Sequence, residues 1–146
     1  MPNICHRVGI QAPPAAVYKA LTAQEGLAGW WTRPDKEGKR IGARMHFRFG
    51  RRGPKMEVIR LKPSRLVAWR CVEGPDEWLN TELTFEISRV GKESVVLFGH
   101  RGWRRECEFM AHCSCKWGYF MLSLKSLLEA GRGTPFPGDR QISKWG

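Results

Sequence analysis

A cluster of cysteine and histidine residues in the last third of the chain has the residue types that bind metal ions. His112 directly precedes Cys113, Ser114 and Cys115, and Cys107 lies a few residues earlier. The surrounding apolar residues recur every three or four positions, which predicts a helix, and residues two apart in a helix point about 200° away from each other. Cys113 and Cys115 therefore cannot share one ion, and only His112 with Cys115 has ligand-like spacing. We expect no metal site, a packing role for Cys113 and a partly exposed thiol for Cys115.

The residue best suited to acid–base chemistry is His100, because an imidazole has its ordinary pKa close to neutral pH. It ends a segment with strand periodicity and precedes a turn. Two interpretations stay open: His100 faces a cavity as an acid or base, or it ties the strand end to the next loop, which is the commoner role. The sequence contains no HExxH, GxSxG, P-loop or GxGxxG motif, so no catalytic residue and no cofactor is assigned.

Large apolar side chains are unusually frequent, with seven Trp, seven Phe and five Met in 146 residues. Strand and helix periodicity turns many of them toward one interior, where they either fill a core or line a cavity for a lipophilic small molecule. The candidate binding residues, with His100, are Trp30, Trp31, Phe47, Phe49, Met56, Val58, Trp69, Phe85, Met110, Trp117 and Met121.

Helices and strands must position these side chains, and the strands are indicated where apolar residues recur at every second position. Residues 4–10 alternate as a strand, and good helix formers follow the Pro13-Pro14 pair, with a second short helix expected over residues 23–31. Five further strands are expected around residues 45–49, 56–58, 66–72, 83–87 and 94–98, and one long amphipathic helix over residues 106–130.

This order predicts an α+β domain over residues 1–135, followed by a Pro- and Gly-rich tail over residues 136–146. Short connections between successive strands predict an antiparallel sheet of about six strands. Such a sheet cannot cover its apolar face alone, and only the long C-terminal helix can lie across it. We therefore expect the sheet to curve around that helix.

Charge is distributed unevenly along the basic chain, which has 25 Lys and Arg against 14 Asp and Glu and a net charge of +11. Residues 33–65 contain twelve basic and three acidic residues, whereas residues 71–93 contain six acidic and two basic residues. The basic segment is either an electrostatic footprint for nucleic acid or an acidic protein partner, or a solvated face of strands and turns. No nucleic-acid-binding module is present, so no specific nucleic acid is expected.

The redox and membrane signals favour the reducing cytoplasm. Five cysteines form no paired framework, which is typical of free thiols. No apolar run approaches the roughly 20 residues of a membrane span, so no transmembrane helix or signal peptide is expected.

Several strings occur in an order that is characteristic of one superfamily. Residues 10–22 read I-x-A-P-P-x-x-V-Y-x-A-L-T, and Leu27 and Trp30-Trp31 follow. Later strings are Met56-Glu57-Val58, residues 63–69, 74–78 and 83–85, and His100-Arg101-Gly102-Trp103. The chain resembles the START-like helix-grip superfamily, also called SRPBCC, and its branch similar to the activator of heat shock protein 90 ATPase (AHSA-like).

The resemblance implies a curved sheet gripping the C-terminal helix, with an apolar cavity between them. Proteins of this superfamily include lipid carriers, cyclase enzymes and co-chaperones, so the fold alone does not determine the function. The first expectation is a monomer or homodimer that binds a lipophilic small molecule in that cavity. The alternatives are a co-chaperone-like protein-binding module and, third, an enzyme of the cyclase or dehydratase type.

Overall fold

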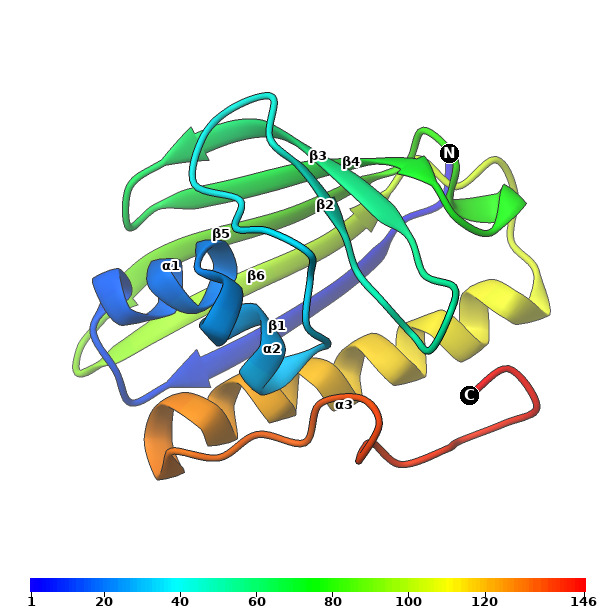
Figure 1. Cartoon of the computed structure of the whole chain (residues 1–146). Helices are drawn as coiled ribbons and strands as arrows, with labels where there is room; N and C mark the ends of the chain where they lie inside the picture. Colours follow the sequence, from blue (N-terminus) through cyan, green and yellow to red (C-terminus); the bar gives the residue numbers. More distant parts are fainter.

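A computed structural model describes all residues, 1–146, as six strands, three α-helices and one short 3-10 helix (Figure 1). In chain order the elements are β1 (Ile4–Ile10), α1 (Pro14–Thr22), α2 (Gln24–Trp30), β2 (Arg44–His46), β3 (Lys55–Lys62), β4 (Leu66–Glu73), η1 (Asp76–Trp78), β5 (Glu82–Val90), β6 (Glu93–Arg101) and α3 (Glu108–Ala130).

The helix boundaries follow from local backbone chemistry. Pro14 occupies the first helical position of α1, where a missing N–H removes no intrahelical bond. At the other end of the chain, α3 stops at Gly131, which adopts the left-handed conformation with φ of 80°. Glycine reaches that conformation without steric strain, and its N–H bonds back to the Leu127 carbonyl.

The six strands form one antiparallel sheet in the order β1-β6-β5-β4-β3-β2. The first strand therefore pairs with the last, and its Val8 lies opposite Val96. Inward positions alternate with outward ones, so that Met56 and Val58 of β3 are fully buried while Glu57 between them is half-buried. The α+β class, the sheet and the two short helices predicted from the sequence are confirmed.

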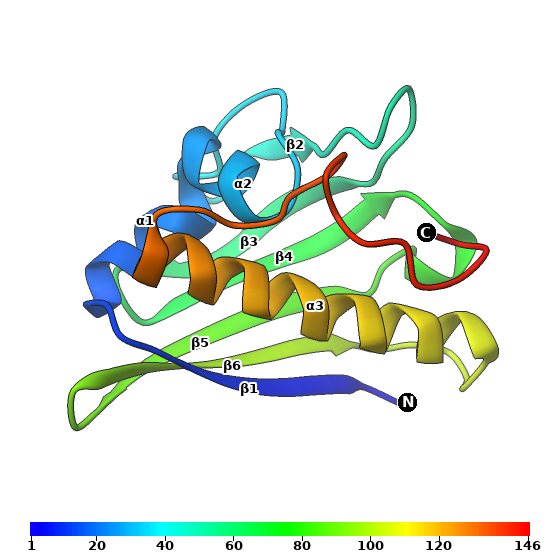
Figure 2. The same cartoon turned by 90° about the horizontal axis from the view of Figure 1, so that it is seen from below.

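The long helix α3 lies along one face of the sheet, and the two short helices cover the same face at one end (Figures 1 and 2). Residues 131–146 turn back at the end of α3 and run along the helix toward its beginning (Figure 2). No helix has the combination of length and apolar composition that a membrane crossing requires.

The predicted strand around residues 45–49 is shorter in the structure, because β2 ends at His46. Beyond it, Phe47 forms only an isolated bridge with Pro34, and Phe49 forms one with Arg52. The Asp35 carboxylate accepts a hydrogen bond from the His46 backbone N–H at 2.9 Å, which occupies that N–H at the sheet edge. The chain then leaves the sheet plane and brings Phe49 toward the C-terminal tail.

Candidate functional site

A pocket of about 620 Å³ opens at the end of the sheet near the beginning of α3. Its walls come from α3, from the loop between β2 and β3, from the turn that contains η1, and from the tail. A volume of this size is in the range of small-molecule sites, which are mostly apolar with a few polar groups. The aromatic rings that line it include Trp31, Phe49, Trp78, Trp117, Phe120 and Phe136.

The aromatic walls are held by ring packing between distant segments. Trp31, at the end of α2, lies 5.0 Å from Trp117 of α3 between ring centroids. Phe49 meets Phe136 of the tail edge to face at 5.1 Å. Edge-to-face and offset arrangements are the favoured geometries of aromatic pairs. The first contact joins the end of α2 to α3, and the second holds the tail against the β2–β3 loop.

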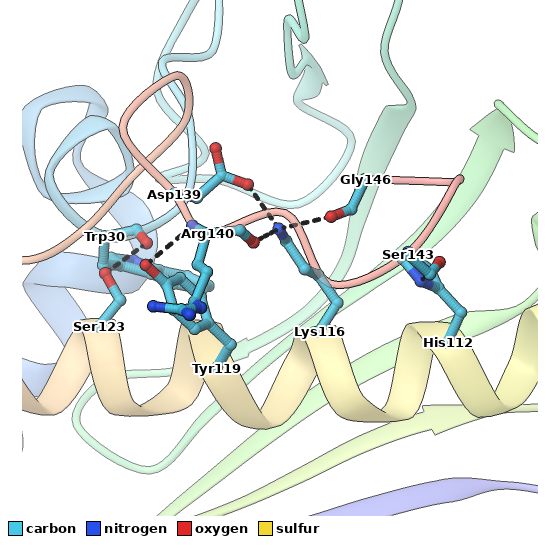
Figure 3. A network of polar contacts seen from close by, with 9 residues as sticks. All are labelled: Trp30, His112, Lys116, Tyr119, Ser123, Asp139, Arg140, Ser143 and Gly146. Atoms are coloured by element: carbon cyan, nitrogen blue, oxygen red, sulfur yellow. Dashed lines mark hydrogen bonds and ion pairs between the residues drawn. The ribbon is translucent and has the colours of Figure 1, made fainter.

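The polar centre of the pocket is an ion pair between Lys116 and Asp139 at 2.7 Å (Figure 3). Only 13% of the Lys116 side chain and 4% of the Asp139 side chain are exposed. The Lys116 ammonium also donates to the backbone oxygens of Arg140 and Gly146. One residue of α3 therefore holds three points of the tail.

Further hydrogen bonds fasten the tail along α3 (Figure 3). The Tyr119 hydroxyl accepts from the Arg140 backbone N–H at 3.1 Å, and His112 Nδ1 lies 2.6 Å from Ser143 Oγ. Ser123 Oγ donates to the Trp30 carbonyl at 2.8 Å and accepts from the Thr134 N–H at 2.7 Å. Burial, and next the positive charge of Lys116, lower the pKa of His112 below its ordinary value.

His100 lies in the core beside the pocket and is fully buried. Trp117 Nε1–H donates to His100 Nδ1 at 3.2 Å, and His100 Nε2 lies 2.8 Å from Thr81 Oγ1. The Thr81 hydroxyl gives its only hydrogen to the Trp78 carbonyl, so the proton of the imidazole is on Nε2. Burial lowers the pKa of His100 to about 3. Both ring nitrogens are occupied, which favours the structural interpretation of His100 over acid–base chemistry.

The twelve residues predicted from the sequence are distributed over the pocket and the core. Trp31, Phe49 and Trp117 line the pocket. Met110 is half-buried and packs against the core. The other eight are buried in the core and do not line the pocket: Trp30, Phe47, Met56, Val58, Trp69, Phe85, His100 and Met121.

The tail supplies pocket residues that sequence reasoning did not include, namely Phe136, Asp139, Gln141, Trp145 and Gly146. The available signal was the occurrence of Phe136 and Trp145 in an otherwise Pro- and Gly-rich segment. Large aromatic side chains in such a segment indicate docking onto a surface. Lys116 was also missed, since an isolated lysine on an amphipathic helix ordinarily faces solvent.

Comparison with known families identifies the fold. The family model described as "Activator of Hsp90 ATPase homolog 1-like protein" matches residues 11–129, which is most of the chain. The chain belongs to this family. The match runs from just before α1 to nearly the end of α3, so the tail lies outside the matched residues. None of the curated proteins matches the chain.

Solved structures agree with the family assignment. The Aha1 dimer from Colwellia psychrerythraea is 41% identical and superposes with a TM-score of 0.84 over 91% of this chain and 100% of that one. Protein MLL2253 from Mesorhizobium loti has 19% identity and a TM-score of 0.78, over 88% and 98% of the two chains. CalU16 from Micromonospora echinospora has the same identity and TM-score over 97% and 75%. The last two show the fold alone.

Proposed function

We propose that this Hsp90-activator-like domain binds a lipophilic small molecule in the pocket between α3, the tail and the end of the sheet. The observation that supports it is the pocket of about 620 Å³ with its aromatic walls. The five cysteines are all free, which supports the proposed location in the reducing cytoplasm.

The pocket lies at the opening of the sheet and not deep between sheet and helix. Packing of Trp69 against Phe85 at 5.0 Å and of Phe98 against Trp117 at 4.7 Å fills the space that a deeper cavity would need. A ligand can therefore enter without displacing the core. Its apolar surface would be buried against rings, and such burial contributes about 25 cal/mol per Å².

An uncharged solvatochromic dye such as Nile red is expected to bind the folded chain at one site. Cys113 is a small buried residue of the pocket wall, so Cys113→Phe places a ring in the pocket and should weaken binding about tenfold or more. Fluorescence titration gives the affinity.

The matched control is Leu122→Phe, which adds a ring at an exposed position of the same helix. Its dye affinity should equal that of the unmodified chain. Equal dye affinity of Cys113→Phe, with circular dichroism showing both variants folded, would place the dye elsewhere and contradict the proposal.

The family match favours a second candidate, a protein-binding module that stimulates an Hsp90-type chaperone. Residues 33–65 would supply the surface. The basic residues of that segment that form no ion pair are Lys36, Arg40, Arg48, Arg51, Arg52, Lys62 and Arg65. All seven are exposed. A surface of uncompensated positive charge accelerates association with an acidic partner. The 41% identical relative is described as a dimer, so a homodimer is the assembly proposed for this function.

Under this second candidate, adding the chain to an Hsp90-type chaperone should raise the rate of ATP hydrolysis. The double charge reversal Arg48→Glu and Arg51→Glu should lower the stimulation severalfold and make it less sensitive to salt. Lys144→Glu reverses one exposed charge in the tail and serves as control. An unchanged hydrolysis rate with the folded parent chain would exclude this candidate for that chaperone.

A further inference from the structure

The tail contributes both apolar and polar side chains to the pocket wall, namely the Phe136 ring and the Asp139 carboxylate. Asp139 lies on the tail, lines the pocket, and has only 4% of its side chain exposed. Its Oδ2 pairs with Lys116, but its Oδ1 is buried without a hydrogen-bond partner in the protein. Buried carboxylate oxygens are ordinarily satisfied, so an unpartnered one in a pocket wall indicates a missing donor.

Lys116, which pairs with Asp139 Oδ2, has no hydrogen left to donate to Asp139 Oδ1. An ammonium has three hydrogens, and those of Lys116 are directed to Asp139 Oδ2, the Arg140 carbonyl and the Gly146 backbone oxygen. The Trp78 indole N–H, which also belongs to the pocket wall, has no hydrogen-bond partner in the protein either. The pocket wall therefore contains one unsatisfied acceptor, Asp139 Oδ1 beside Lys116, and one unsatisfied donor, the Trp78 N–H.

The charges in the pocket wall indicate the net charge that a ligand should carry. The Lys116 ammonium already compensates the Asp139 carboxylate at 2.7 Å. Arg52 also lines the pocket, and the chain carries a net charge of +11. A cationic ligand would be repelled by this surplus. A carboxylate ligand would be attracted by the exposed Arg52, but at Lys116 it would find no unoccupied donor and would face the Asp139 carboxylate.

Resting on the proposed function, we propose that the ligand is a neutral aromatic compound whose hydroxyl group donates a hydrogen bond to Asp139 Oδ1. The rings of Trp31, Trp117 and Phe136 provide stacking surfaces. The family match ends at residue 129, so Asp139 lies outside the part of the chain that the family model describes.

Three naphthalene probes of one size test the hydroxyl requirement: 2-naphthol, 2-methoxynaphthalene and 2-naphthoate. Isothermal titration with the full chain should show 2-naphthol binding about tenfold or more tightly than the methoxy compound, because a hydrogen bond to a charged group is among the stronger ones. The carboxylate probe should bind weakest. Equal binding of the first two would overturn the hydroxyl assignment while leaving the proposed function intact. Binding of none by the folded chain would overturn both.

The variant Asp139→Asn reverses the hydrogen-bonding sense at this position. Its amide oxygen remains the acceptor for Lys116, so its NH2 replaces the free oxygen and offers a donor. The preference should shift to 2-methoxynaphthalene, whose oxygen only accepts. Glu86→Gln makes the same chemical change at an exposed position outside the pocket and should leave the preference unchanged. Retained preference for 2-naphthol in folded Asp139→Asn would contradict the assignment to Asp139.

Discussion

Replacing Trp117 by alanine is expected to lower the free energy of unfolding by about 3 to 5 kcal/mol. The side chain is 2% exposed and packs on Trp31 and Phe98 at centroid distances of 5.0 and 4.7 Å. Its N–H is also the donor to His100 Nδ1, and removing that donor leaves a buried acceptor unsatisfied. Chemical denaturation measures this loss, provided that the dependence of the unfolding free energy on denaturant concentration has the same slope in both proteins.

Two variants separate the contributions to this loss. Trp117→Phe keeps a ring but removes the N–H and should cost about 1 to 3 kcal/mol, less than alanine. Leu122→Ala truncates an exposed side chain of α3 and should stay within about 0.5 kcal/mol of the parent. A loss of about 2 to 3 kcal/mol for Trp117→Ala would mean that the ring behaves as a pocket wall bordering existing space. A loss below about 0.5 kcal/mol would contradict its burial.

Acidification from pH 7 to pH 5 is expected to lower the free energy of unfolding by about 2 kcal/mol through His100 alone. Burial lowers the pKa of this imidazole from 6.5 to about 3 in the folded chain. The unfolded chain thus takes up a proton near pH 6.5 that the folded chain does not. The stabilisation is complete above that pH and decreases at about 1.4 kcal/mol per pH unit as the pH falls toward 3.

Denaturation at several pH values measures this slope in the parent and in His100→Gln. The variant should lose most of the dependence between pH 7 and 5, whatever its absolute stability. His112→Gln is the matched control. The pKa of His112 is also lowered, but its side chain is only half-buried, so this variant should keep most of the pH dependence between pH 7 and 5. The carboxyl groups of Glu25, Glu73 and Glu129, whose pKa values are lowered from 4.5, act mainly below the window. An identical slope in His100→Gln would contradict a neutral buried imidazole.

The architecture could be predicted from the sequence because its signals are local and repeated. Alternation in β3 and the three- to four-residue spacing around Trp117 reflect burial against one common layer. The end of β2 could not be predicted, because the alternation of Met45, Phe47 and Phe49 continues beyond the pairing. The strand pairing ends there because of contacts between segments distant in the sequence, which the spacing of apolar residues does not reveal.

The candidate site was harder to predict than the fold. Inward-facing rings such as Trp69 and Phe85 have the same sequence pattern whether they fill a core or line a pocket. The difference depends on how tightly they pack, which only coordinates reveal. The ion pair between Lys116 and Asp139 joins a helix to an irregular segment. No periodic pattern in the sequence relates these two residues.

The tail that carries Asp139 adds no strand to the sheet and lies outside the family match. Its anchors lie on one face of α3, as with the Thr134 N–H on Ser123, and directly after α2, where the Trp31 carbonyl accepts from the Phe136 N–H. Substitutions between these anchors can alter the pocket without disturbing the sheet or its strand register. The chemistry of this wall of the pocket can therefore change while the packing of the six strands stays the same.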